Sequence, residues 1–250
     1  MHLLEYYASD HWLARIDARI KLLVTLIVLV MVLSYQGVGF QLIVAAFSLA
    51  LIISMKIPWR LFLLRFSEPL LIVLVIFLLK IFFSGHDPLF SFEILGFHLT
   101  AYREGLAEGI AIGSRIMAAI SLMAVLVYAT PFPELMAALS WLKVPRGFIE
   151  ILLYAYRYIF VLFEEAMVIY QAQKNRLGYA NFRNRLSSFG ILTGSLILKA
   201  FEQSQTLSTA MVQRGYDGNM PLFQSRPFRS SEIFLSCLVV TAMGILWSRI

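Results

Sequence analysis

Two short segments of this 250-residue chain each place an arginine just before a glycine, after an alanine and a polar tail. Their residues are Ala172, Gln173, Arg176 and Gly178 in the first, and Ala210, Gln213, Arg214 and Gly215 in the second. A guanidinium group offers a planar fork of donors that fits a carboxylate with two hydrogen bonds. A nearby glycine lets another backbone come close. The pattern therefore predicts two points of contact with acidic groups on a partner protein.

The same residues also have a plainer interpretation. A basic side chain near a helix C-terminus interacts favourably with the helix dipole, and a glycine commonly ends a helix. Either segment alone would be explained in that way. Two such ends on neighbouring helices favour the contact interpretation.

Two long helices must position the arginines. Pro145 opens a helix predicted over 146–176, and Asn184 can cap a second that runs to 214. Each would be about 46 Å long at 1.5 Å per residue. The connecting "LGYANFR" is short, so the two helices are expected to form a hairpin. A shorter helix is predicted over 133–142.

The composition is that of a membrane protein. Hydrophobic residues make up 60% of the chain and charged residues 14%, whereas soluble domains are nearer to about 45–50% and about 25%. The predicted fold class is an all-α membrane protein with about five transmembrane helices and a cytoplasmic helical hairpin. The expected spans lie near 20–36, 39–55, 67–84, 104–129 and 232–248. Residues 2–19 are polar and mixed in charge, so no cleavable signal is expected.

Basic residues orient these spans. Arg15, Arg19 and Lys21 flank the first span, and eleven Lys or Arg residues fall within 131–231. Because cytoplasmic loops are enriched in Lys and Arg, the N-terminus and this segment are predicted to be cytoplasmic, in a bacterial or archaeal inner membrane. The organisation expected is a four-span bundle over 1–130, cytoplasmic helices over 131–231 and a final span over 232–250.

The apolar middles of the two hairpin helices leave an alternative open. Segments 148–163 and 191–201 are nearly free of charge and could be two additional spans, which would make seven. Glu150, Arg157 and Glu164 interrupt the first of them at intervals of seven residues. Charges in mid-bilayer are costly, so the hairpin at or near the membrane surface is the favoured interpretation.

Glycines recur every four residues on two predicted helices, namely at Gly105, Gly109 and Gly113, and at Gly190 and Gly194. Such spacing allows helix backbones to approach closely. The partner can be another helix of this chain or another membrane protein, and both possibilities stay open.

The sequence gives little support for a catalytic site or a metal site. The chain has no G-x-x-x-x-G-K-[ST] motif, so ATP hydrolysis by this chain is not expected. His2, His11, His86 and His98 show no ligand spacing and Cys237 is alone, so we predict no metal site and no cofactor. Glu164 and Glu165 lack the arginine and histidines that a glutamate-based membrane protease needs.

Arg115 supports one competing function. It lies deep in the fourth predicted span, where an ionisable residue is a natural transport site. A self-sufficient permease with its own substrate path is therefore the alternative. Arg115 could equally pair within the bundle, for instance with Glu108, two turns earlier on the same face.

The chain resembles the transmembrane T component of energy-coupling factor transporters, in the cobalt CbiQ-like branch. The resemblance rests on "AMVQRGYDGNMP", on "FEEAMVIYQAQKNRLGY" and on "LARIDARIKLLVTLIVLVMVLS". Three positions depart from the family pattern. Gln213 stands where alanine is common, Leu177 separates Arg176 from its glycine, and Ala18 replaces a proline.

The resemblance implies a non-catalytic subunit of an ATP-driven importer. In that family two cytoplasmic helices end in Ala-Arg-Gly-type motifs that dock into grooves on two ABC ATPase subunits. On this chain the motifs correspond to Arg214 and, with the Leu177 departure, to Arg176. A separate substrate-binding membrane subunit would hold the metal, cobalt or nickel. The surroundings are lipid, and no nucleic acid is expected.

Overall fold

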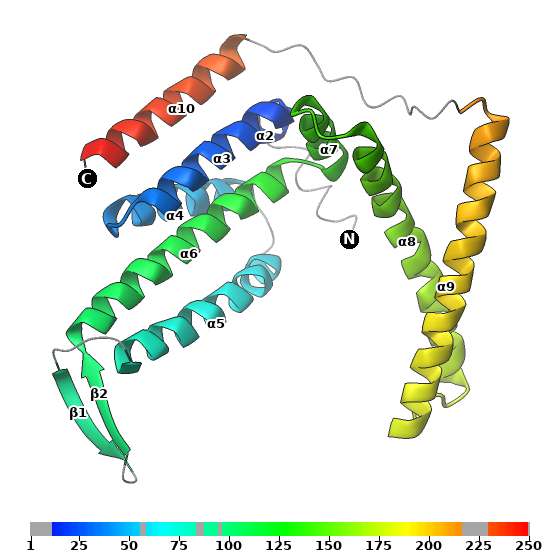
Figure 1. The fold of residues 1–250 in the computed structure, drawn as a ribbon, viewed down its shortest axis with the longest axis horizontal. Helices are drawn as coiled ribbons and strands as arrows, with labels where there is room; N and C mark the ends of the chain where they lie inside the picture. The colour runs from blue at the N-terminus through cyan, green and yellow to red at the C-terminus, as the bar shows by residue number, and fades with distance from the viewer. Residues whose placement is uncertain (1–11, 56–58, 84–87, 95–96, 217–229, 250) are drawn as a thin grey trace. The chain divides into compact units, whose positions relative to one another are not determined.

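The computed structural model describes residues 12–55, 59–83, 88–94, 97–216 and 230–249. The chain divides into two compact units. The first comprises residues 1–138 and 225–250, and the second comprises residues 139–224. Figure 1 shows the helices and strands of both.

The first unit is a helical bundle arranged around one long helix. Its elements are α2 (Trp12–Arg15), α3 (Ala18–Ser34), α4 (Gly39–Ser54), α5 (Trp59–Phe83), β1 (Pro88–Ile94), β2 (Phe97–Tyr102), α6 (Arg103–Ala129) and α10 (Ser230–Arg249). The short α7 (Phe132–Trp141) follows α6. Helix α6 packs against α3, α4 and α5, and α10 packs against α3 (Figure 1).

Three described helices are long and apolar enough to cross a membrane. They contain Phe66–Phe83 in α5, Arg103–Ala129 and Ser230–Arg249. The other two expected spans form helices of 17 and 16 residues, α3 and α4. Their lengths of roughly 25 Å fall short of the hydrocarbon core of about 30 Å. The all-α membrane fold is thus confirmed, with three clear spans and two shorter apolar helices.

The segment between α5 and α6, which the sequence analysis left without a predicted element, contains a β-hairpin. Strands β1 and β2 pair antiparallel, with Ser91 opposite Thr100 and Phe92 opposite Leu99. The sequence carries a signal for these strands, because "FSFEI" and "FHLTAY" alternate with the period of two that indicates paired strands.

Buried and half-buried polar side chains connect α6 to the turn between α3 and α4. Arg115 Nη2 donates to the Tyr35 carbonyl oxygen at 2.8 Å, and Gln41 Nε2 donates to the same oxygen at 3.1 Å. Ser114 Oγ donates to Gln41 Oε1. These bonds satisfy the carbonyl of the residue that caps α3. Arg115 therefore does not pair with Glu108, which accepts instead from Lys80 Nζ at 2.8 Å.

The glycines of α6 lie where α5 packs. A Cβ at residue 109 would lie 2.9 Å from Phe77 Cδ2, and one at residue 113 would lie 3.1 Å from Val73 Cγ1. Gly105 is buried on the same helix. This arrangement favours packing within the chain for Gly109 and Gly113. By contrast, a Cβ at Gly190 or Gly194 would meet nothing within 4 Å.

The second unit is the predicted helical hairpin. Helix α8 runs Arg146–Asn175 and α9 runs Phe182–Gln213, close to the expected bounds. The start of α9 was predicted wrongly, because Asn181 and not Asn184 occupies the N-cap. Both helices are long, yet neither is among the described helices that are apolar enough to span a membrane. This composition argues against the seven-span alternative.

Side-chain contacts pair the two helices antiparallel along their length. From the turn outward the pairs are Gln173 with Ser188, Glu165 with Lys199, Tyr154 with Met211, and Glu150 with Tyr216. In Figure 1 helix α8 runs toward the turn and α9 runs back from it, and the two helices cross. The C-terminus of α9 consequently lies beside the start of α8, one helix length away from the turn.

Candidate functional site

Arg176 and Arg214 occupy the same structural position at the ends of α8 and α9. Each is the C-cap residue of its helix. Each is exposed, and neither guanidinium forms a hydrogen bond or an ion pair with any described residue. Ala172 and Ala210 each lie one helical turn before the arginine, where a small side chain leaves space beside it. The similarity of the two sequence segments therefore reflects equivalent positions of the two arginines at the ends of their helices.

Both helix ends adopt the same backbone arrangement. After Arg214, the Gly215 N–H donates to the Val212 carbonyl at 3.0 Å and the Tyr216 N–H donates to the Met211 carbonyl at 3.0 Å. Gly215 has a φ of 79°. This pair of bonds with a left-handed residue after the cap is the Schellman arrangement, which satisfies the last free carbonyls of a helix.

The first end reproduces this arrangement with a different residue in the left-handed position. The Leu177 N–H donates to the Lys174 carbonyl at 3.1 Å, and the Gly178 N–H donates to the Gln173 carbonyl at 2.9 Å. Leu177 has a φ of 59°. Leu177 therefore corresponds to Gly215, and the extra residue before the glycine leaves Arg176 in register with Arg214.

Gly178 serves a separate purpose at this end. A Cβ there would lie 2.6 Å from Ser188 Oγ and 2.9 Å from the Gln173 carbonyl oxygen. Ser188 Oγ donates to the Gly178 carbonyl at 2.9 Å. The sequence reading assigned Gly178 to stopping the helix, but Leu177 adopts the stopping conformation and Gly178 permits the close approach of α9.

A network of side chains holds the turn together. Gln173 Nε2 donates to the Ser188 carbonyl at 3.0 Å, and Tyr179 OH donates to Gln173 Oε1 at 2.7 Å. Arg185 Nε donates to the Tyr179 carbonyl at 3.0 Å. The backbone that carries Arg176 is therefore fixed from both helices.

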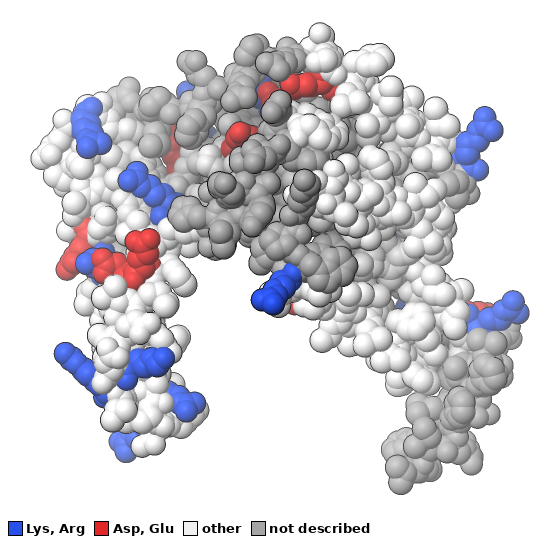
Figure 2. Space-filling model, turned by 180° about the vertical axis from the view of Figure 1, so that it is seen from behind, with Lys and Arg blue, Asp and Glu red and all other residues white. Residues whose placement is uncertain are grey.

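Basic side chains gather around this turn. Figure 2 shows Lys and Arg side chains clustered at the end of the limb that α8 and α9 form. The exposed basic residues near the turn are Lys174, Arg176, Arg183 and Arg185. Such a cluster attracts an acidic surface before any specific contact forms.

Two tyrosines hold the opposite end, where Arg214 lies. Tyr216 OH donates to Glu150 Oε2 at 2.9 Å, and Tyr154 OH donates to Met211 Sδ at 3.3 Å. Burial, followed by the nearby Glu150 carboxylate, raises the pKa of Tyr154 above its usual value. The hydroxyl therefore stays protonated as a donor. The sequence analysis did not assign a role to either tyrosine. The only available signal was the position of Tyr216 directly after Arg214 and Gly215.

Some predicted features lie outside this site or outside the described residues. Asp217, Gly218 and Pro221, which continue the second segment, are not among the described residues, and neither are His2, His11 and His86. Within the described part of the chain, no group of three or more His, Cys, Asp or Glu side chains is placed to hold a metal ion. Gln213 lies in the last turn of α9, next to Arg214, and is exposed.

The family profile described as cobalt transport protein, CbiQ, matches residues 9–223. The chain belongs to the CbiQ family. The match covers every element described above except α10, including both arginine ends. This CbiQ-family chain is therefore a membrane protein of a transport family.

Individual relatives agree with this placement. The chain is 28% identical to an uncharacterized protein of Methanocaldococcus jannaschii, over 90% of this chain and 84% of that protein. It is 32% identical to the cobalt transport protein CbiQ of Rhodobacter capsulatus, over 57% of this chain and 58% of that one. It is 28% identical to the energy-coupling factor transporter transmembrane protein EcfT of Lactococcus lactis, over 98% and 97% of the two chains. The chain is thus similar to proteins of both names, and it is a transmembrane component of the energy-coupling factor type.

Proposed function

We propose that this chain is the coupling subunit of an energy-coupling factor importer for cobalt or nickel ions. It would transmit a conformational change from two ABC ATPase subunits to a separate substrate-binding membrane subunit, and it would supply no catalytic residue. One observation carries the proposal: Arg176 and Arg214 are equivalent C-cap residues with unengaged guanidinium groups at opposite ends of one hairpin.

The placement of the arginines suggests how force is transmitted. Each guanidinium would enter a cleft on one ATPase subunit and form charge-assisted hydrogen bonds, each worth about 1.5–3 kcal/mol when buried. Because the arginines lie one helix length apart, about 45 Å, each ATPase would hold one end of the hairpin. Closure of the ATPase pair would then act along the hairpin and change how α8 and α9 cross.

The exposed apolar side chains of the hairpin support a further membrane partner. Large apolar side chains that are more than half exposed occur throughout both helices, including Phe148, Ile151, Phe163, Phe189, Ile197 and Phe201. A patch of this extent marks an interaction surface in a soluble segment. The proposed substrate-binding subunit, together with lipid at the membrane surface, would cover it. In the proposed arrangement, the hairpin and the N-terminus would face the cytoplasm, as the distribution of Lys and Arg predicts.

Substitution of the arginines tests the proposal. Arg214→Ala and Arg176→Ala should each reduce co-purification of the ATPase subunits and abolish metal uptake in cells, while the chain still inserts. The matched control is Arg157→Ala, which removes an exposed arginine from the middle of α8, away from both helix ends and from the basic cluster. If the Arg214→Ala and Arg157→Ala proteins behave alike, the C-cap arginine is only a helix stop.

The permease alternative is less well supported. Its proposed site residue, Arg115, is engaged with the Tyr35 carbonyl in a buried network that holds the α3–α4 turn. Cobalt or nickel binding by the purified chain alone would favour the permease and contradict the coupling role.

A further inference from the structure

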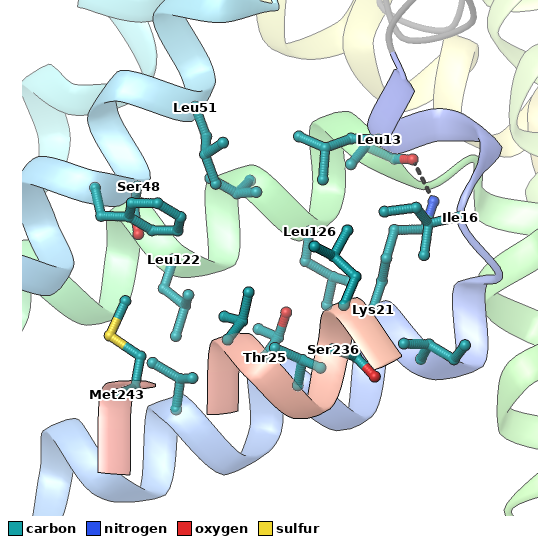
Figure 3. Close-up of a pocket in the computed structure, with 18 of the residues that line it drawn as sticks. Leu13, Ile16, Lys21, Thr25, Ser48, Leu51, Leu122, Leu126, Ser236 and Met243 are labelled. Atoms are coloured by element: carbon teal, nitrogen blue, oxygen red, sulfur yellow. Dashed lines mark hydrogen bonds between the residues drawn. The ribbon is translucent and has the colours of Figure 1, made fainter. Parts of the chain in front are cut away.

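A cavity of about 280 Å³ lies inside the first unit, between α3, α4, α6 and α10 (Figure 3). Its wall is almost entirely aliphatic and includes Val24, Val28, Val44, Leu122, Leu126 and Met243. A cavity with such a lining stays dry and takes up apolar molecules. Since the surrounding helices belong to a membrane protein, lipid is the apolar molecule at hand.

The charged groups of this cavity lie at one end. Lys21, in the first turn of α3, and Glu232, in the first turn of α10, both line it. Lys21 Nζ donates to the carbonyl of Ala129, the last residue of α6, at 2.7 Å. Lys21 forms no ion pair with any described residue, so its remaining hydrogens can serve a ligand. We call this region the polar end of the cavity.

Ser48 presents an unsatisfied hydroxyl farther along the cavity. The C-cap of α4, Met55, packs with Leu13 and Ala129 in one core cluster, so α4 ends near the polar end. Ser48 precedes Met55 by seven residues and lies about 10 Å deeper. It lines the cavity, is 1% exposed, and its Oγ has no hydrogen-bond partner among the described residues.

Other buried serines in this unit satisfy their hydroxyls within their own helix. Ser121 Oγ, for example, donates to the Ala118 carbonyl at 3.0 Å. Ser48 has no such bond, and a buried polar group without a partner is costly. The hydroxyl therefore indicates an occupant that brings a hydrogen-bond acceptor to this depth.

The chemical order along the cavity matches that of a glycerophospholipid. Charged groups come first, then a hydroxyl and finally an aliphatic wall, which parallels headgroup, ester and acyl chain. We propose that the cavity binds one phospholipid of the bilayer, with its phosphate beside Lys21, its ester carbonyl accepting from Ser48 Oγ, and one acyl chain along Val28, Val44 and Met243. Glu232 suits the ammonium of an ethanolamine headgroup.

The test is native mass spectrometry of the full chain, released from detergent and titrated with phosphatidylethanolamine. A single tightly bound lipid is expected at saturation. Leu122→Trp places a large ring in the cavity and should weaken binding at least tenfold. Leu71→Trp is the matched control, because Leu71 is 62% exposed on α5 and does not line the cavity.

A second variant keeps the test decisive if Leu122→Trp fails to fold. Ser48→Ala removes only the hydroxyl and should raise the Kd about three- to tenfold, the effect of one hydrogen bond. Several weakly bound lipids with no 1:1 species, or equal affinity in the Leu122→Trp and Leu71→Trp proteins, would overturn the proposal. An unchanged Kd for Ser48→Ala would overturn the contact with the ester.

Discussion

At the scale of single residues, the two arginine ends reach the same geometry with different residues. Gly215 takes the left-handed conformation readily, whereas Leu177 takes it at a cost, because its Cβ crowds the following carbonyl. The hydrogen bonds around Gln173 and Ser188 hold the turn in that conformation. The first end is therefore stabilised by its surroundings, and the second by its glycine.

Gly178→Ala should destabilise the hairpin. Its Cβ would lie within 3 Å of both Ser188 Oγ and the Gln173 backbone oxygen, and we expect a loss of about 1–3 kcal/mol. Gly190→Ala is the matched control, because a Cβ at that helical position meets nothing within 4 Å and should stabilise the protein by about 0.5–1 kcal/mol. Thermal unfolding followed by circular dichroism measures both. Equal melting temperatures for the two variants would contradict the close approach at Gly178.

Arg214→Lys should preserve only part of the proposed docking. Lysine retains the charge but lacks the planar fork, so roughly one charge-assisted hydrogen bond is lost. We expect ATPase association about tenfold weaker than for the unmodified chain, and stronger than for Arg214→Ala. Surface plasmon resonance with immobilised transporter chain measures this order. If the Arg214→Lys protein bound the ATPase subunits as tightly as the unmodified chain, the ATPase would recognise only the positive charge at this position.

At the scale of secondary-structure elements, the end of α9 depends on contacts with α8. Tyr216→Phe removes the hydroxyl that donates to Glu150, a carboxylate only 7% exposed. The free energy of local opening at the α9 terminus should fall by about 1–2 kcal/mol. Hydrogen exchange over residues 205–216 reports this change. Tyr158→Phe on α8 is the control, because the Tyr158 hydroxyl forms no hydrogen bond with any described residue and its loss should leave the exchange unchanged.

Gly109→Leu should separate α5 from α6. A Cβ at residue 109 already meets the Phe77 ring at 2.9 Å, so a leucine forces both helices to shift at a cost of about 1–3 kcal/mol. Gly244→Leu on α10 is the control, because a Cβ there meets nothing within 4 Å. Thermal stability in detergent distinguishes the two. A Gly109→Leu protein as stable as its control would mean that the glycine spacing does not serve α5 packing.

Sequence patterning predicted the elements better than it predicted their contacts. The bounds of α8 follow from Pro145 and the arginine end, and the apolar runs locate the helices of the first unit. The β-hairpin was not predicted, because its alternating runs are only seven and six residues long and lie between long apolar segments. The partner of Arg115 was missed because a backbone carbonyl, that of Tyr35, leaves no mark in a sequence.

The cavity and the left-handed conformation of Leu177 could not be predicted either, because both depend on contacts between segments that are distant in the sequence. Each depends on how side chains from distant segments meet, as Ser48 and Met243 do across the cavity. Helical periodicity identifies a buried face but does not specify which helix covers it. The equivalence of Arg176 and Arg214 was visible as a motif, but their common register depends on the left-handed conformation of Leu177 and Gly215.

At the scale of the whole molecule, the purified chain should neither hydrolyse ATP nor bind its cargo. It carries no phosphate-binding loop motif. We therefore expect no phosphate release above background from the chain alone, and no heat of binding with Co²⁺ or Ni²⁺ in isothermal titration calorimetry. Reconstitution with both ATPase subunits should restore turnover. Hydrolysis by the chain alone would contradict a purely coupling role.

The antiparallel pairing of α8 and α9 also restricts how this protein can change over evolutionary time. The two helices are joined at the hairpin turn, so the distance of each residue from that turn decides which residue it faces on the other helix. A deletion of four residues in α8 would therefore move Glu150 away from Tyr216 unless α9 lost the same length. Insertions and deletions in the two helices must therefore occur in matched pairs. The lengths of α8 and α9 therefore change together during evolution. Their common length sets the distance between any two subunits that bind the ends of the hairpin.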